Sequence, residues 1–161
     1  MIQLNDKQII EYLHRCYTAV DGLWFMKLED KHGFDTALEI DTDVWRIMPK
    51  IQARALKAMA NPEDGIEGLM DCFSFKMMVE DYTFTTEKIE NPDGYRIIIN
   101  KCPWLELLVK SGRENLAGTI GTAICNNDSS AWAAEFGDDI KFKLQDQMCK
   151  DSSQCILQFS H

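Results

Sequence analysis

Hydrophobic residues in the first half of the chain recur at three- and four-residue spacing, the period of an amphipathic helix. The first such segment follows Asp6, which can cap it. It ends at His32-Gly33, because glycine supplies the left-handed conformation common at helix C-termini. Its apolar positions are Ile9, Leu13, Cys16, Tyr17, Val20, Leu23 and Trp24. The spacing therefore predicts a long N-terminal helix.

Shorter helical segments are predicted between this helix and Glu80. A short helix is expected over residues 34–40, and Thr42 can cap the next segment. Pro49 lies inside that segment and should kink or split it, since proline lacks the N–H that a helix interior needs. Asn61-Pro62 combines a capping residue with proline at the first helical position, which predicts a further helix reaching about Glu80.

After Glu80 the hydrophobic period changes from helical to alternating. Two hairpins rich in β-forming residues are predicted, residues 82–101 with a turn at 91–94 and residues 140–160 with a turn at 150–153. Helical spacing returns between them. Three helices are expected there: 103–111, 114–125 and 129–137.

Two hairpins and five or six helices predict an α+β fold, with a four-stranded antiparallel sheet and helices packed on one face. The N-terminal half is helical. We expect a single domain over residues 1–161. Its helical part is 1–80, and its hairpin-helices-hairpin part, 81–161, carries four cysteines.

Composition narrows the function classes. The 161 residues carry a formal net charge of −9 without a basic cluster, which argues against nucleic acid as a partner. No apolar run is long enough to span a membrane, and the first residues lack the pattern of a signal peptide. We therefore expect a cytoplasmic protein without a membrane partner, whose six cysteines stay reduced.

Cys102 is the most informative position. The residue before a proline avoids the helical region, and Pro103 suits the first helical position, so Cys102 is expected at a strand end as a helix N-cap. The helix dipole and the free amides there favour a thiolate, so the pKa of Cys102 should be lowered. A thiolate suits a nucleophile or a metal ligand. The alternative is a small cap residue without further role.

Cys125 continues a stripe of small residues, Ala117 and Gly121, at four-residue steps. Such a stripe admits a close backbone or a ligand, and close helix packing explains it equally well. Asp128 follows shortly afterwards. We favour Asp128 or Ser129 as an N-cap, and the alternative is a buried Asp128 that faces Cys102 and serves in ligand orientation or proton transfer.

Cys149 and Cys155 flank the tip of the closing hairpin, where facing side chains can lie near enough to share a metal. Alternation directs Cys155 towards the core and Cys149 towards solvent. Only a bulge near Met148 would turn Cys149 inward.

Cys102, Cys125, Cys149 and Cys155 together can form a Cys₄ zinc site. Their spacing matches no compact Cys-x-x-Cys knuckle. Cys16 and Cys72 have the spacing of ordinary core residues on helices. The sequence contains no glycine-rich phosphate loop, no His-Glu-x-x-His pair and no nucleophile elbow.

The C-terminal half, about residues 80–161, resembles two related groups. The shared features are a strand followed by Cys102-Pro103-Trp104, then Ile124-Cys125-Asn-Asn-Asp128, then a hairpin ending in Cys155-Ile-Leu-Gln-Phe159. One group is the family named for aminothiazoline-carboxylate hydrolase. The other is the vinyl-reductase-type domain of small-molecule sensors, whose closing hairpin bears two cysteines, as Cys149 and Cys155 do here.

The two resemblances imply different functions. Likeness to vinyl-reductase-type domains implies zinc held by Cys102, Cys125, Cys149 and Cys155 beside a pocket for a small, largely apolar molecule. Cys102 stands where those domains often have histidine, and four thiolates also suit an iron–sulfur cluster. Likeness to the hydrolase implies that Cys102 attacks a small cyclic C–N compound, with Asp128 assisting; Cys149 is not part of that pattern.

From these features we expect a zinc-stabilised domain that binds a small molecule, with a cysteine-dependent hydrolase as the alternative. Whether the protein is an enzyme, and whether it forms a homodimer, is left open by the sequence.

Overall fold

The computed structural model describes residues 2–161. They fall into two compact units, one that ends at Asp43 and one that covers Val44–His161. The chain therefore divides earlier than the boundary near residue 80 that separates the two parts of the expected single domain. That single domain stays a prediction.

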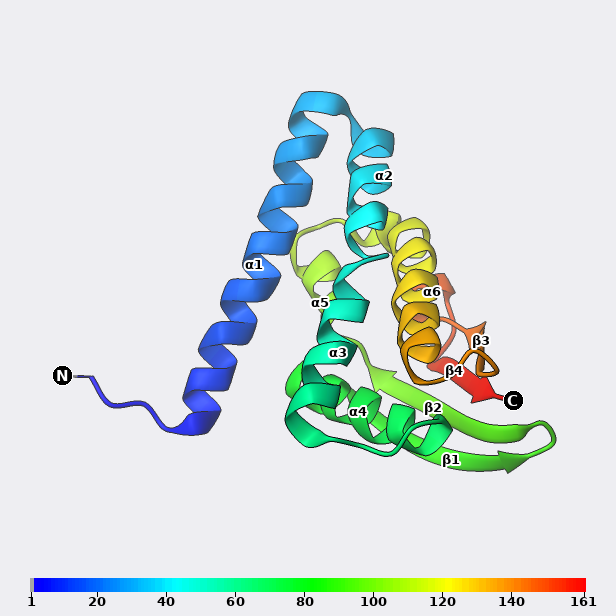
Figure 1. The fold of residues 1–161 in the computed structure, drawn as a ribbon. Helices are drawn as coiled ribbons and strands as arrows, with labels where there is room; N and C mark the ends of the chain where they lie inside the picture. Colours follow the sequence, from blue (N-terminus) through cyan, green and yellow to red (C-terminus); the bar gives the residue numbers. More distant parts are fainter. Residues whose placement is uncertain (1) are drawn as a thin grey trace. The chain divides into compact units, whose positions relative to one another are not determined.

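The N-terminal unit is formed by α1 (Asp6–His32) and most of α2 (Phe34–Val44) (Figure 1). Asn5, rather than Asp6, caps α1. Its carboxamide accepts the Gln8 backbone N–H at 2.9 Å, and the Gln8 side chain accepts the Asn5 N–H at 3.0 Å. Gly33 ends the helix with φ +83°, as the sequence predicts. Next to this turn the rings of Phe25 and Phe34 meet edge to face.

The next two helices are α3 (Met48–Ala60) and α4 (Ile66–Val79). Pro49 lies in the first turn of α3, so the expected split is confirmed. Asn61, however, ends α3 in the left-handed conformation instead of opening α4, which begins after Gly65. Asn tolerates that conformation, and a proline directly after it is typical of helix ends. The predicted start of α4 was therefore four residues too early.

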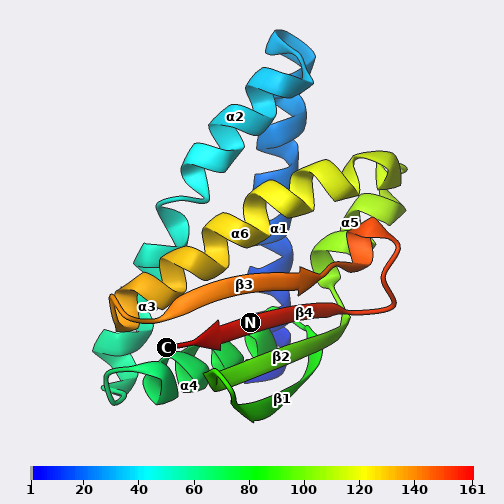
Figure 2. The same ribbon diagram turned by 90° about the vertical axis from the view of Figure 1, so that its right-hand side faces the viewer.

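The sheet consists of β1 (Thr83–Glu90), β2 (Asp93–Lys101), β3 (Lys141–Asp146) and β4 (Cys155–Ser160). The strands run antiparallel in the order β1-β2-β4-β3 (Figure 2). Both predicted hairpins are present. Among the described residues 2–161 there are six α-helices, so the α+β class with a helical N-terminal half is confirmed.

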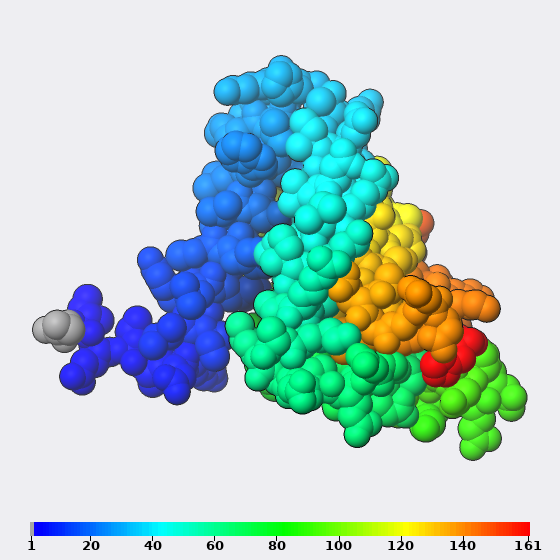
Figure 3. All heavy atoms as spheres, in the orientation of Figure 1, coloured from blue at the N-terminus to red at the C-terminus, as the bar shows by residue number. Residues whose placement is uncertain are grey.

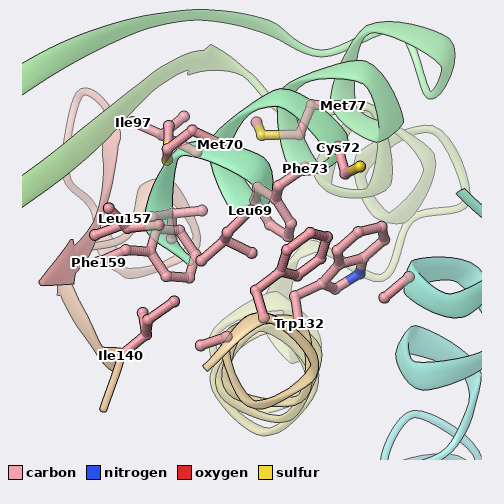
Figure 4. Close-up of a cluster of buried hydrophobic side chains, with 14 of the residues drawn as sticks. Leu69, Met70, Cys72, Phe73, Met77, Ile97, Trp132, Ile140, Leu157 and Phe159 are labelled. Carbon is pink, nitrogen blue, oxygen red and sulfur yellow. The ribbon is translucent and has the colours of Figure 1, made fainter. Parts of the chain in front are cut away.

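The core lies between one face of the sheet and the helices α4 and α6 (Ala117–Phe136) (Figure 4). Phe73 of α4 packs edge to face against Trp132 of α6 and against Phe159 of β4. All three side chains are fully buried. Ile97 of β2 pairs with Leu157 of β4 on the same face. This arrangement fixes the helices relative to the ends of β2 and β4.

Between the sheet halves the chain forms α5 (Pro103–Lys110), a 3₁₀ turn η1 (Glu114–Leu116) and α6. The sequence predicted two helices where α6 is one. Residues 126–129 do not interrupt it, because the side chains of Asn126 and Asp128 find partners without breaking the helix. The Asn126 amide donates to the Thr122 carbonyl at 2.7 Å, and Asp128 accepts from Lys76. The predicted cap at Asp128 or Ser129 was therefore wrong.

No helix within residues 2–161 is long and apolar enough to cross a membrane.

Candidate functional site

Two of the four candidate cysteines lie where β2 ends and β4 begins. Cys102 has extended backbone angles and precedes Pro103, the first residue of α5, as predicted from the sequence. Cys155 opens β4 and pairs with Ile99 of β2, three residues before Cys102. Both cysteines pack against the hydrophobic core. The inward direction predicted for Cys155 is confirmed.

Cys149 approaches the small-residue face of α6. A Cβ added at Gly121 would lie 2.8 Å from the Cys149 Sγ, and one at Gly118 would lie 3.0 Å from the Cys149 carbonyl oxygen. The glycines of this stripe therefore admit another segment of the chain. Cys125 lies one helical turn beyond Gly121, so it follows the same face of α6.

The strand-alternation argument that directed Cys149 towards solvent does not hold. Cys149 lies in a 3₁₀ turn, η2 (Met148–Lys150), and not in a strand. The register of β3 against β4 also shifts between Leu144 and Asp146. A turn and a register irregularity reset the side-chain direction, so period two no longer applies.

The four thiols influence one another electrostatically. Burial raises the pKa of Cys125 well above its usual value, and Cys102, Asp128, Cys155 and Cys149 raise it further. Burial likewise raises the pKa of Cys155 to about 11, with contributions from Cys102 and Cys149. Four sulfurs from the end of β2, the middle of α6, η2 and the start of β4 thus share one neighbourhood.

The pKa of Cys102 is raised, so the predicted lowering was wrong. Burial is the largest cause. The backbone N–H groups of Leu105 and Trp104 and the Tyr82 hydroxyl act in the opposite sense, as the helix-end argument requires, but they do not outweigh burial. Without a bound cation, Cys102 is a thiol at neutral pH.

The donor set fits a metal that prefers soft ligands, because four thiols are the ligand type of structural zinc. The Met148 N–H donates to the Cys155 Sγ at 3.2 Å, a contact that stabilises a thiolate. Gln147 carries a buried side-chain nitrogen without an acceptor among the described residues. Nevertheless, no three or more His, Cys, Asp or Glu side chains within residues 2–161 are gathered closely enough to hold a metal ion. A metal would require the sulfurs to move together.

A buried charged cluster, which the sequence interpretation missed, adjoins the thiols. The Lys76 ammonium lies 2.9 Å from Asp128 and 3.8 Å from Glu80, and all three side chains are buried. Burial alone would lower the pKa of Lys76, but the two carboxylates raise it overall. The Trp104 indole N–H lies 3.5 Å from Glu80. Burial, followed by Cys102, Glu80 and Cys125, raises the pKa of Tyr82 well above its usual value.

One signal in the sequence could have revealed this cluster. Lys76 lies in the last turn of α4, and Glu80, four residues later, caps the helix. Both follow the face that carries the core residues Cys72, Phe73 and Met77. A charged pair on an apolar helix face needs a partner from elsewhere in the fold.

Residues 3–116 match a protein-family model described as a family of unknown function, DUF6125. The chain belongs to the DUF6125 family. The matched residues include Cys102 and end before α6, so Cys125, Cys149 and Cys155 lie outside them. No curated protein matches the chain.

One solved structure similar to the DUF6125 chain is the crystal structure of the phenol-responsive sensory domain of the transcription activator PoxR with phenol. The match covers 99% of this chain and 76% of that chain, with 12% sequence identity and a TM-score of 0.46. A similarity of this size carries no argument about function.

The remaining site candidates of the DUF6125 chain are also located. Asp128 is buried, as the alternative to a cap requires, but its carboxylate is bonded to Lys76. Cys72 is a core residue, as predicted. Cys16 is exposed, so its predicted core position was wrong. All six cysteines are free thiols in the structure.

Proposed function

We propose that the DUF6125 chain is a small-molecule-binding domain stabilised by zinc at Cys102, Cys125, Cys149 and Cys155. The observation that carries the proposal is the convergence of these four thiols from separate segments of the chain. The four cysteines come from the end of β2, from α6, from η2 and from the start of β4. Thiolates are the preferred ligands of structural zinc.

The neighbouring residues support thiolate formation once a cation is present. The Met148 N–H already donates to Cys155, and the N–H groups of Trp104 and Leu105 favour the charged form of Cys102. A bound zinc ion supplies the positive charge that offsets the burial of the thiolates, and four protein ligands leave it no open position for catalysis. An iron–sulfur cluster is distinguished by its visible absorption.

Aromatic side chains beside the thiols support the small-molecule part of the proposal. Trp104 of α5 packs edge to face against Trp45 at 5.6 Å, and Tyr82 lies close enough to Cys102 for that thiol to raise its pKa. Small-molecule sites combine such apolar and aromatic walls with a few polar groups. Here the polar group nearest the aromatic pair is Glu80, which lies 3.5 Å from the Trp104 indole N–H and is also paired with Lys76. The resemblance to vinyl-reductase-type domains likewise implies a pocket for a small, largely apolar molecule beside the cysteines.

The hydrolase alternative is less well supported. It requires Cys102 to attack as a thiolate, whereas burial raises the pKa of that thiol. The second residue that it invokes, Asp128, is engaged by Lys76.

Native mass spectrometry of protein purified without a metal-affinity step tests both parts of the proposal. The mass should exceed that of the chain by zinc and, before dialysis, by a small organic molecule. Phenol and indole then serve as probes in thermal-shift measurements. Trp104→Leu should weaken any shift, while Phe75→Leu, on the exposed face of α4, should preserve it. A bare chain mass together with no shift for either probe would contradict the binding-domain proposal.

A further inference from the structure

The helix α1 carries an apolar face that the structure leaves exposed. Ile9, Leu13, Val20 and Leu23 are all exposed large hydrophobic residues, and Cys16 between them is exposed as well. Figure 3 shows the side chains of α1 in blue. Amphipathic helices normally bury their apolar face, and a large apolar patch that stays exposed usually marks an interaction site.

The spacing along the face is that of a coiled coil. Steps of four, three, four and three residues lead from Ile9 through Leu13, Cys16 and Val20 to Leu23. This heptad period keeps the apolar seam facing a second helix along its whole length. Binding to a flat surface does not require a heptad period. The positions beside the seam are also apolar or aromatic: Ile10, Tyr12, Tyr17, Ala19, Trp24 and Met26.

The charges of α1 lie off the seam. Glu11 and Arg15 pair with each other at 3.0 Å, and both are well exposed. The five seam positions from Ile9 to Leu23 carry no charged residue. A face without charge needs no partner of opposite sign, so an identical face is complementary to it.

The area of the face suits a dimer. Tyr12 and Trp24 are 62% and 66% exposed, and the exposed aliphatic residues of the face are about half exposed. From typical side-chain areas, these residues offer on the order of 500 Å² of apolar surface. A standard interface of about 800 Å² per partner contains a similar apolar area.

We propose that α1 pairs with α1 of a second copy of this chain along the seam Ile9, Leu13, Cys16, Val20 and Leu23. Cys16 is the middle residue of the seam. Any two-fold pairing over the full seam, parallel or antiparallel, places the two Cys16 side chains within about one helical turn of each other. The charge of the chain and the mixed charges of α1 do not suit an acidic membrane surface, which selects helices with a basic polar face.

Because Cys16 lies in the seam, cross-linking and alkylation of its thiol can detect the dimer. The full chain is studied by sedimentation velocity from low to tens of micromolar concentration and treated with a short bis-maleimide. We expect a dimer whose cross-link maps to Cys16 of both copies and is lost in Cys16→Ser. Alkylation of Cys16 should also slow as the concentration rises and the dimer forms.

A matched pair of variants locates the interface. Val20→Glu and Arg15→Gln each lower the charge by one, on the seam and off the seam respectively. Val20→Glu should raise the dissociation constant about a hundredfold or more, because it buries an unpaired charge in each copy. Arg15→Gln should leave the constant within about threefold, since it changes an exposed ion pair.

Several outcomes would overturn the proposal. These are a monomer throughout the concentration range, a dimer without the Cys16 cross-link, or a dimer insensitive to Val20→Glu. A monomer in which Cys16 is protected would show that the chain covers its own seam. Sedimentation of a monomer with vesicles of phosphatidylcholine and phosphatidylserine would identify a membrane surface as the occupant.

Discussion

Removal of the Lys76 charge should destabilise the fold far more than removal of the Asp128 charge. Lys76 contacts two buried carboxylates, Asp128 at 2.9 Å and Glu80 at 3.8 Å. Lys76→Met keeps the packing of the stem but leaves two buried negative charges without a cation. Breaking a buried ion pair in this way costs about 3–5 kcal/mol.

Asp128→Asn removes one carboxylate but leaves the Lys76–Glu80 ion pair in place. Lys76 keeps Glu80 as its counter-charge, and the oxygen of the introduced carboxamide can still accept a hydrogen bond. The expected loss is therefore only about 1–2 kcal/mol. Arg54→Met is the control for removal of a cation at the surface. Arg54 lies 2.8 Å from Glu135 but is 69% exposed, so we expect about 0–1 kcal/mol.

Urea unfolding of the three variants at constant pH and metal content measures these losses by linear extrapolation. If Asp128→Asn proved as damaging as Lys76→Met, or both cost under about 1 kcal/mol, the buried cluster would not have the charge balance described above.

Two further predictions concern the thiol neighbourhood. Gly121→Ala should lower stability, since a Cβ there would lie 2.8 Å from the Cys149 Sγ, and overpacking costs about 1–3 kcal/mol. Gly22→Ala, in α1 with open space around it, should instead raise stability by about 0.5–1 kcal/mol. If chemical denaturation showed that both variants are stabilised, or both destabilised, the close approach of Cys149 to Gly121 would be refuted. Metal-free protein should lose stability as the pH rises from about 8.5, where unfolded cysteines ionise, towards about 11, the raised pKa of Cys155 in the folded state. Metal-loaded protein should instead be destabilised in acid, because protonation of the thiolates releases the metal. A melting temperature of the metal-free protein that rises as the pH increases above about 8.5 would contradict the assignment of buried thiols.

Local signals in the sequence were sufficient for most of the fold. Alternation and turn residues predicted both hairpins, and the Cys102-Pro103 step placed Cys102 at a strand end before a helix. Pro49 correctly marked the division of a helical segment. Each of these features depends on residues that are neighbours in the chain, so periodicity and proline chemistry are enough to find them.

The errors arose where a distant residue decides the outcome. Asp128 has the character of a helix cap, but Lys76, 52 residues away, satisfies it inside a continuous helix. The pKa of Cys102 depends on how deeply the fold buries the thiol, which outweighs the helix-end effect. The apolar stripe through Cys16 was recognised, but spacing alone does not say which surface covers it. Periodicity describes one helix at a time, whereas these features depend on pairs of elements.

The central claim, one metal ion shared by four cysteines, is tested most directly by metal analysis of protein purified without a metal-affinity step. We predict about one zinc ion per chain in the parent protein. Cys102→Ser and Cys155→Ser should each lower the zinc content and the melting temperature together, because binding free energy contributes to folding. Cys72→Ser, a buried thiol of the core, should retain zinc while costing about 1 kcal/mol of packing. Full metal retention by both Cys102→Ser and Cys155→Ser, or a metal-free parent protein, would contradict the claim.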